Sequence, residues 1–124
     1  MELNNLEIRR QIETYSDRYE RALAENNVET LNDLFWVGSE AVRYGVTENL
    51  YGSDEISAFR SNRTDGAPAR KNLCRHITTI NNNCAIVCIE FRQQASQRKG
   101  RQMQTWVCSN NKWKIIAAHV SLLH

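Results

Sequence analysis

The stretch FWVGSEAVRYGVTENLYGSDEISAFRSNR, residues 35–63, indicates how this chain folds and where it acts. It places a short predicted strand, Val42-Arg43-Tyr44, between the end of one helix and the start of another. Side chains alternate across a strand, so Val42 and Tyr44 share one face while Arg43 points to the other. If Arg43 lies on the face that helices cover, its guanidinium sits in an aromatic cavity, which is costly without an anionic partner. We therefore expect Arg43 to bind a small anion. The alternatives are a structural salt bridge with an acid such as Glu90, or stacking at a subunit interface.

The composition is that of an ordinary globular protein. Of the 124 residues, 41% are hydrophobic and 24% are charged, and the net charge is +2. We expect one domain, residues 1–124. The charge is too small to predict binding to nucleic acid or to an anionic membrane, and no apolar run approaches the roughly 20 residues of a membrane span. The N-terminal MELNNLEIRRQIE lacks the apolar segment of a secretory signal, so we expect a cytoplasmic protein.

The N-terminal third is predicted to be helical and carries the second candidate residue, Tyr19. Apolar residues recur at helical spacing over residues 6–25, with Asn4 as the expected N-cap and Glu7 in the capping-box position. Tyr19 lies on this inward stripe. It either lines a cavity or packs in the core with its hydroxyl bonded to a backbone group. A second helix is predicted over residues 28–35.

The rest of the chain is predicted to form strands and one more helix. Residues 41–46 pair with residues 49–52, and Ser53 is the expected cap of the third helix. Beyond it the pattern has the period of strands, which are predicted over residues 73–80, 84–94, 101–109 and 112–122. Short polar turns join these strands, so neighbours are expected to be antiparallel. Three helices followed by a curved antiparallel sheet make an α+β fold.

Strand alternation gives further candidates for a binding pocket. On the last strand one polar pair interrupts an apolar face, which is typical of a cavity wall; the expected face contains Trp113, Ile115, Ala117, His119 and Ser121. Gln104 and Trp106 share a face of the preceding strand, and Gln104 could hydrogen-bond a urea-like amide. Three aromatic residues could form the floor of the cavity, with core packing as the alternative: Trp36, Tyr51 and Phe59. Arg63 follows Phe59 on nearly the same side of its helix.

Cysteine and histidine patterns predict no metal or other cofactor. The four cysteines, Cys74, Cys84, Cys88 and Cys108, have no metal-ligand spacing and are expected to be reduced. No cluster of histidines and acids has ligand spacing.

Several strings in this chain resemble a known family. They are YERAL at 19–23, LFW at 34–36, VRYG at 42–45, ENLYG at 48–52, AFR at 58–60, ITT at 77–79, GRQ at 100–102 with QTW at 104–106, and AAHVSL at 117–122. The order of elements resembles the nuclear-transport-factor-2-like (cystatin-like, SnoaL-like) cone. The strings resemble a narrower family of small proteins encoded with oxalurate and cyanuric-acid catabolism genes. The chain departs from that pattern at Met103 and over residues 62–65.

The resemblance implies a fold, a catalytic pair and an activity. It implies a cone-shaped sheet, with Tyr19 and Arg43 matching the family's catalytic tyrosine and arginine. The implied activity is metal-independent hydrolysis of 1,3-dicarboxyurea with decarboxylation; oxalurate is a weaker candidate ligand. Arg43 would grip a carboxylate and Tyr19 would position or deprotonate water, or protonate the leaving nitrogen.

Two other functions fit the same fold. One is a binding module that holds a small carboxylate or urea-like molecule without turnover. The other is a ketosteroid-isomerase-like proton shuttle, which needs a carboxylate base facing an apolar cavity. Neither the Tyr19 helix nor the Arg43 strand offers one, and Glu90 is the only strand acid available.

The outer face of the sheet predicts a homodimer, because exposed apolar patches usually meet a partner. The apolar residues expected there, depending on which set faces out, are Leu73 or Cys74, Val87, Val107, Ile116 and Val120.

Overall fold

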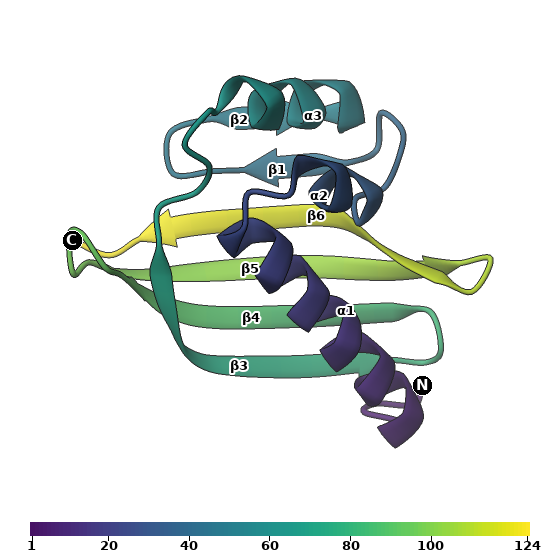
Figure 1. Cartoon of the computed structure of the whole chain (residues 1–124). Helices are drawn as coiled ribbons and strands as arrows, with labels where there is room; N and C mark the ends of the chain where they lie inside the picture. Colours follow the sequence, from purple (N-terminus) through teal and green to yellow (C-terminus); the bar gives the residue numbers. More distant parts are fainter.

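The computed structural model describes residues 1–124, and its first helix, α1 (Leu6–Ala24), crosses one face of the sheet (Figure 1). The N-cap is Asn5 and not Asn4, because the Asn5 side chain accepts hydrogen bonds from the backbone N–H groups of Glu7 and Ile8. Asn4 instead accepts a hydrogen bond from the backbone of Thr79, which ties the start of the helix to a strand.

Six strands form one curved sheet in the order β2-β1-β6-β5-β4-β3. Their bounds are β1 Val42–Tyr44, β2 Asn49–Tyr51, β3 Arg70–Ile80, β4 Cys84–Gln93, β5 Lys99–Ser109 and β6 Lys112–Leu122. The α+β cone expected from the sequence is confirmed. One pair differs from the expected antiparallel pattern, because β1 runs parallel to β6. These two strands are far apart in sequence, so no tight turn dictates their relative direction.

The two shorter helices cover the end of the sheet that contains β1 and β2 (Figure 1). Helix α2 spans Val28–Asp33 and α3 spans Gly52–Asn62. Ser53 is not the cap of α3. Gly52 has a φ of +83°, which glycine adopts without strain and which lets strand β2 turn directly into the helix. The Ser53 hydroxyl instead accepts a hydrogen bond from the backbone of Gly38.

A β-bulge in β6 decides which of its residues face the helices. Trp106 pairs with Ile115 and Thr105 pairs with Ala117, so Ile116 is an extra residue on β6. The insertion reverses the alternation, because side chains point to opposite faces at successive positions. The predicted common face is therefore wrong beyond Ile115: the inward residues there are Ala118, Val120 and Leu122, whereas His119 and Ser121 lie on the outer face.

The core fills the space between α1 and the inner face of the sheet. Its largest fully buried side chains are those of Trp106, Trp113, Phe35 and Phe91. Val87, expected as a possible outward residue, is fully buried in this core. All four cysteines are free. None of the helices is both long enough and apolar enough to cross a membrane.

Candidate functional site

A cavity of about 310 Å³ opens between the helices and the inner face of the sheet. Helix α1 contributes Tyr19 to its lining, β1 contributes Arg43, and α3 with the residue after it contributes Phe59 and Arg63. The loop after α3 and the four long strands complete the wall. Four of the candidates singled out in the sequence therefore lie around one cavity.

Arg43 is 9% exposed and its charge is balanced by an acid from its own hairpin. Its Nη1 donates to Oε1 of Glu48 at 2.9 Å. The alternative of a structural salt bridge is therefore confirmed, but its acid is Glu48 and not Glu90, which lies on the opposite face of the sheet and pairs with Lys99. A separation of five residues across the tight β1–β2 hairpin is what brings Glu48 to Arg43.

Glu48 is held as a carboxylate at the edge of the cavity. Its Oε2 accepts hydrogen bonds from the backbone N–H of Thr47 at 3.2 Å and from the Thr47 hydroxyl at 2.8 Å. Burial alone would raise the pKa of Glu48, but the hydrogen bonds from Thr47 and Arg43 and the charge of Arg43 bring the pKa below its ordinary value. An acid therefore does face this cavity, which the sequence analysis did not foresee.

Tyr19 is 3% exposed and lines the cavity together with Arg43. Its ring packs against Phe35 with the centroids 6.3 Å apart. Tyr19 thus packs against the core with one part of its ring and faces the cavity with another.

Arg63 lies beside Arg43 without an acid of its own. The guanidinium carbons of Arg43 and Arg63 lie 5.5 and 5.1 Å from the centre of the Phe59 ring. The Nε of Arg63 is buried and has no hydrogen-bond partner. Burial lowers the pKa of Arg63, and the charge of Arg43 lowers it further.

Arg60, which the sequence analysis did not single out, is a third cation behind the cavity. It is only 4% exposed, and its guanidinium carbon lies 4.3 Å from the centre of the Phe35 ring. Nη1 donates to Asn32, whereas the buried Nη2 has no partner. Burial lowers the pKa of Arg60, and the neighbouring phenol of Tyr19 opposes this shift. The sequence did contain a signal for Arg60. It lies four positions after the inward residue Ile56, so helical spacing places it on the same buried face.

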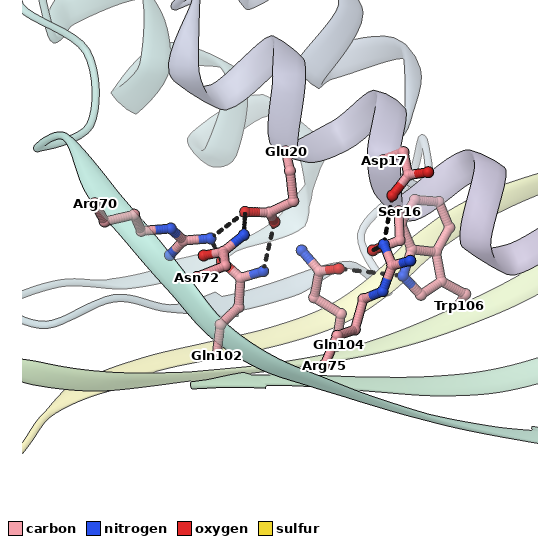
Figure 2. Close-up of polar contacts among 9 residues, drawn as sticks. All are labelled: Ser16, Asp17, Glu20, Arg70, Asn72, Arg75, Gln102, Gln104 and Trp106. Carbon is pink, nitrogen blue, oxygen red and sulfur yellow. Dashed lines mark hydrogen bonds and ion pairs between the residues drawn. The ribbon is translucent and has the colours of Figure 1, made fainter. Parts of the chain in front are cut away.

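A polar network joins α1 to strands β3 and β5 (Figure 2), and two of its members, Arg70 and Gln102, line the cavity. Arg70 Nη2 donates to Glu20 Oε1 at 2.6 Å and to Gln102 Oε1 at 3.0 Å. Gln102 Nε2 donates to the other oxygen of Glu20 at 3.1 Å, and Asn72 also donates to Glu20. Each charged group in this network already has a partner within the protein. The network therefore stabilises the wall of the cavity and offers no free charge to a ligand. Gln102 could have been found in the sequence, since it shares a strand face with Gln104.

Gln104 and Trp106 belong to the core and do not line the cavity. Both are essentially inaccessible, and the indole N–H of Trp106 donates to Gln104 Oε1 at 3.1 Å (Figure 2). The Trp106 ring also meets the edge of Tyr15, with centroids 6.0 Å apart. The two residues do share a strand face, as predicted. At their position along β5, however, that face is packed against the core and does not border the cavity.

Four other candidates lie away from the cavity. Trp36 donates its indole N–H to Glu40, and Tyr51 is 53% exposed with its hydroxyl 3.4 Å from that of Tyr44. The bulge in β6 sends the remaining two, His119 and Ser121, to a separate outer groove of about 430 Å³.

The charge of the lining favours an anionic guest. Three arginines line the cavity, and a single acid, Glu48, lines it with them. No group of three or more histidine, cysteine or acidic side chains is placed to hold a metal ion. The guanidinium groups suit binding of a carboxylate, and the phenol of Tyr19 suits transfer of a proton.

The family model described as AtzH-like matches residues 1–124. The chain belongs to the AtzH-like family. It is 44% identical to a cystatin-like fold protein from Burkholderia xenovorans, with a TM-score of 0.94 and coverage of 99% of this chain and 97% of the other. It is 42% identical to a protein of unknown function of the DUF3225 family from Pectobacterium atrosepticum, with a TM-score of 0.94 and coverage of 98% and 95%. No curated protein matches this AtzH-like chain.

More distant structures share the fold alone. A nuclear-transport-factor-2-like superfamily protein from Salmonella enterica is 18% identical, with a TM-score of 0.74 and coverage of 94% of this chain and 92% of the other. A putative ketosteroid isomerase from Parabacteroides distasonis is 14% identical, with a TM-score of 0.71 and coverage of 86% and 83%.

Proposed function

We propose that this protein hydrolyses a small N-carboxylated urea, of the kind represented by 1,3-dicarboxyurea, with loss of carbon dioxide. Arg43 holds a carboxylate of the substrate, and Tyr19 transfers the proton. The observation that carries the proposal is that Arg43 and Tyr19 line the same cavity, whose arginines outnumber its acid. Membership of the AtzH-like family supports the same choice.

The ion pair with Glu48 leaves Arg43 able to bind a ligand. A guanidinium has five N–H donors, and the pair with Glu48 uses one donor on Nη1. The remaining donors suit a planar carboxylate. The role of Glu48 is then to hold the guanidinium in place beside Tyr19.

The chemical step requires one proton and releases one carboxyl group. The bond between a urea nitrogen and its carboxyl carbon breaks, its electrons stay on the nitrogen, and that nitrogen accepts a proton. The carboxyl carbon leaves as carbon dioxide, which water hydrates to bicarbonate. A phenol hydroxyl can donate this proton, whereas Glu48 is held as a carboxylate and cannot.

The test is turnover by the purified protein. We expect consumption of 1,3-dicarboxyurea, followed by carbon-13 NMR, and loss of this activity in Arg43→Gln and Tyr19→Phe proteins that still fold. Normal turnover by the Arg43→Gln protein, or no turnover by the wild type, would contradict the proposal.

A second candidate function is a binding module that uses the same cavity. It is favoured by the three hydrogen bonds on Glu48, which leave the cavity without a free carboxylate base. A binder would raise its melting temperature in the presence of the ligand without consuming it, and this outcome separates the two functions.

The proton shuttle of ketosteroid isomerases ranks third. Glu48 supplies the carboxylate that the sequence analysis could not find, but its lowered pKa makes it a weak base. Isomerisation of a small ketosteroid by the purified protein, at a rate that urea-like acids do not change, would favour the proton-shuttle function.

A homodimer through the outer face of the sheet remains part of the proposal. That face exposes Met103, with an exposed fraction of 55%. Sedimentation equilibrium tests it: we expect twice the mass of one chain, and a monomer at high concentration would contradict it.

A further inference from the structure

Arg63 is the cation of the cavity that makes no ion pair with an acid. Arg43 is paired with Glu48, and Arg70 is paired with Glu20. The ion pairs of the protein include no contact of Arg63. Arg63 is the C-cap that directly follows α3, with its backbone N–H donating to the carbonyl of Arg60, and its side chain lies against the cavity.

The Arg63 guanidinium has a donor that nothing in the protein satisfies. Its Nε is buried and makes no hydrogen bond. Buried donors are almost always paired, and an unpaired one raises the free energy of the folded state. Burial and the nearby charge of Arg43 lower the pKa of Arg63, while Tyr19 and Glu48 oppose this shift. A carboxylate bound to the Arg63 guanidinium would favour its charged form.

Arg43 and Arg63 are positioned to act on one ligand. They come from different elements, β1 and the end of α3, and their guanidinium carbons lie 5.5 and 5.1 Å from the centre of the same Phe59 ring. Each lines the cavity of about 310 Å³. A ligand with one negative charge can satisfy one of these cations, whereas a ligand with two carboxylates can satisfy both. The third lining arginine, Arg70, is already occupied by Glu20 and Gln102.

We propose that Arg63 binds the second carboxylate of a small dicarboxylate whose first carboxylate is held by Arg43, so that the cavity selects dianions over monoanions. This inference rests on the proposed role of Arg43 as a carboxylate-binding residue. It concerns binding and can therefore be tested without turnover.

The experiment compares two four-carbon acids by isothermal titration calorimetry at fixed ionic strength. Succinate carries two carboxylates and butyrate carries one. We expect wild-type protein to bind succinate more tightly than butyrate by a factor of about 10 to 100, the contribution of one more hydrogen-bonded charge. Arg63→Gln should bring succinate to the affinity of butyrate and leave butyrate unchanged. Arg10→Gln, the same charge change at an exposed arginine without an ion pair, should behave as wild type.

Two results would overturn the inference. One is a wild-type protein without preference for succinate; the other is an Arg63→Gln protein that binds both acids more weakly by the same factor. If Arg63→Gln does not fold, Arg63→Lys decides, because it keeps the charge but loses the planar fork; we expect weaker succinate binding and unchanged butyrate binding. Selective binding of succinate by a protein that does not consume 1,3-dicarboxyurea would remove the hydrolase function and leave this inference standing.

Discussion

Arg43 and Glu48 form an ion pair of 2.9 Å at the wall of the cavity, between the middle of β1 and the turn that follows it. The pair decides how the site works. It neutralises the cation that a substrate must reach, yet it uses one guanidinium nitrogen and leaves the other donors available. The carboxylate of Glu48 therefore orients Arg43, and the incoming anion binds the remaining guanidinium donors without displacing Glu48.

The ion pair predicts how stability depends on pH. In the folded protein the pKa of Glu48 lies below its ordinary value of 4.5: burial would raise it, but Thr47 and Arg43 lower it more. A group whose pKa falls on folding stabilises the protein above its unfolded pKa, and this contribution disappears as the pH falls through the folded pKa. We expect Glu48→Gln to lower the free energy of unfolding near neutral pH, and the difference from wild type to shrink as the pH falls below 4.5. Urea denaturation across this range measures it, and a difference that does not change with pH would refute the assignment.

Tyr19→Phe removes one oxygen from the cavity and keeps the ring that packs on Phe35. We expect a fall in kcat of about 10²- to 10⁴-fold, the usual contribution of a positioned proton donor, with little change in substrate binding. Tyr15→Phe is the matched control, since Tyr15 lies one turn earlier on α1, packs on Trp106 and does not line the cavity. Equal kcat values for the two variants would show that the Tyr19 hydroxyl takes no part in the reaction.

Gly100→Ala should narrow the cavity from the sheet side. A methyl group at Gly100 would collide with the Phe91 ring and come within 2.9 Å of Leu122, and both of these side chains line the cavity. We expect a loss of stability of about 1–3 kcal/mol from overpacking, together with weaker ligand binding. Denaturation and calorimetry test this, and unchanged affinity would mean that Phe91 does not shape the occupied part of the cavity.

Glu20→Ala should destabilise the polar network that joins α1 to strands β3 and β5. Glu20 accepts hydrogen bonds from Arg70, Asn72 and Gln102, and its loss leaves Arg70 without an acid. We expect the free energy of unfolding to fall by about 2–3 kcal/mol. The control Glu13→Ala removes an exposed pair with Arg9 one turn away on the same helix and should cost at most about 0.5 kcal/mol. Similar losses in the two variants would show that the network is no stronger than a surface pair.

Local patterns predicted the fold and part of the site. Helical spacing placed Tyr19 inward, strand alternation placed Arg43 on the face opposite Val42 and Tyr44, and helical spacing placed Phe59 and Arg63 on nearly the same side. Each of these predictions depends only on the regular spacing of side chains within one helix or strand, and the structure preserves that spacing.

Features that depend on contacts between elements were beyond the sequence. The extra residue Ile116 reversed the alternation of β6 and moved His119 and Ser121 to the outer face. A bulge leaves no reliable mark in an apolar strand such as this one. Glu48 reached Arg43 through a hairpin turn, and the pairing of Arg70 with Glu20 spans fifty positions of sequence.

The most direct test of the central claim is a crystal structure of the protein with a small dicarboxylate such as succinate bound. We predict one carboxylate on Arg43, within reach of the Tyr19 hydroxyl, with Glu48 still paired to the same guanidinium. Electron density for the ligand only in the outer groove beside His119, or a ligand in the cavity that contacts neither Arg43 nor Tyr19, would contradict this account.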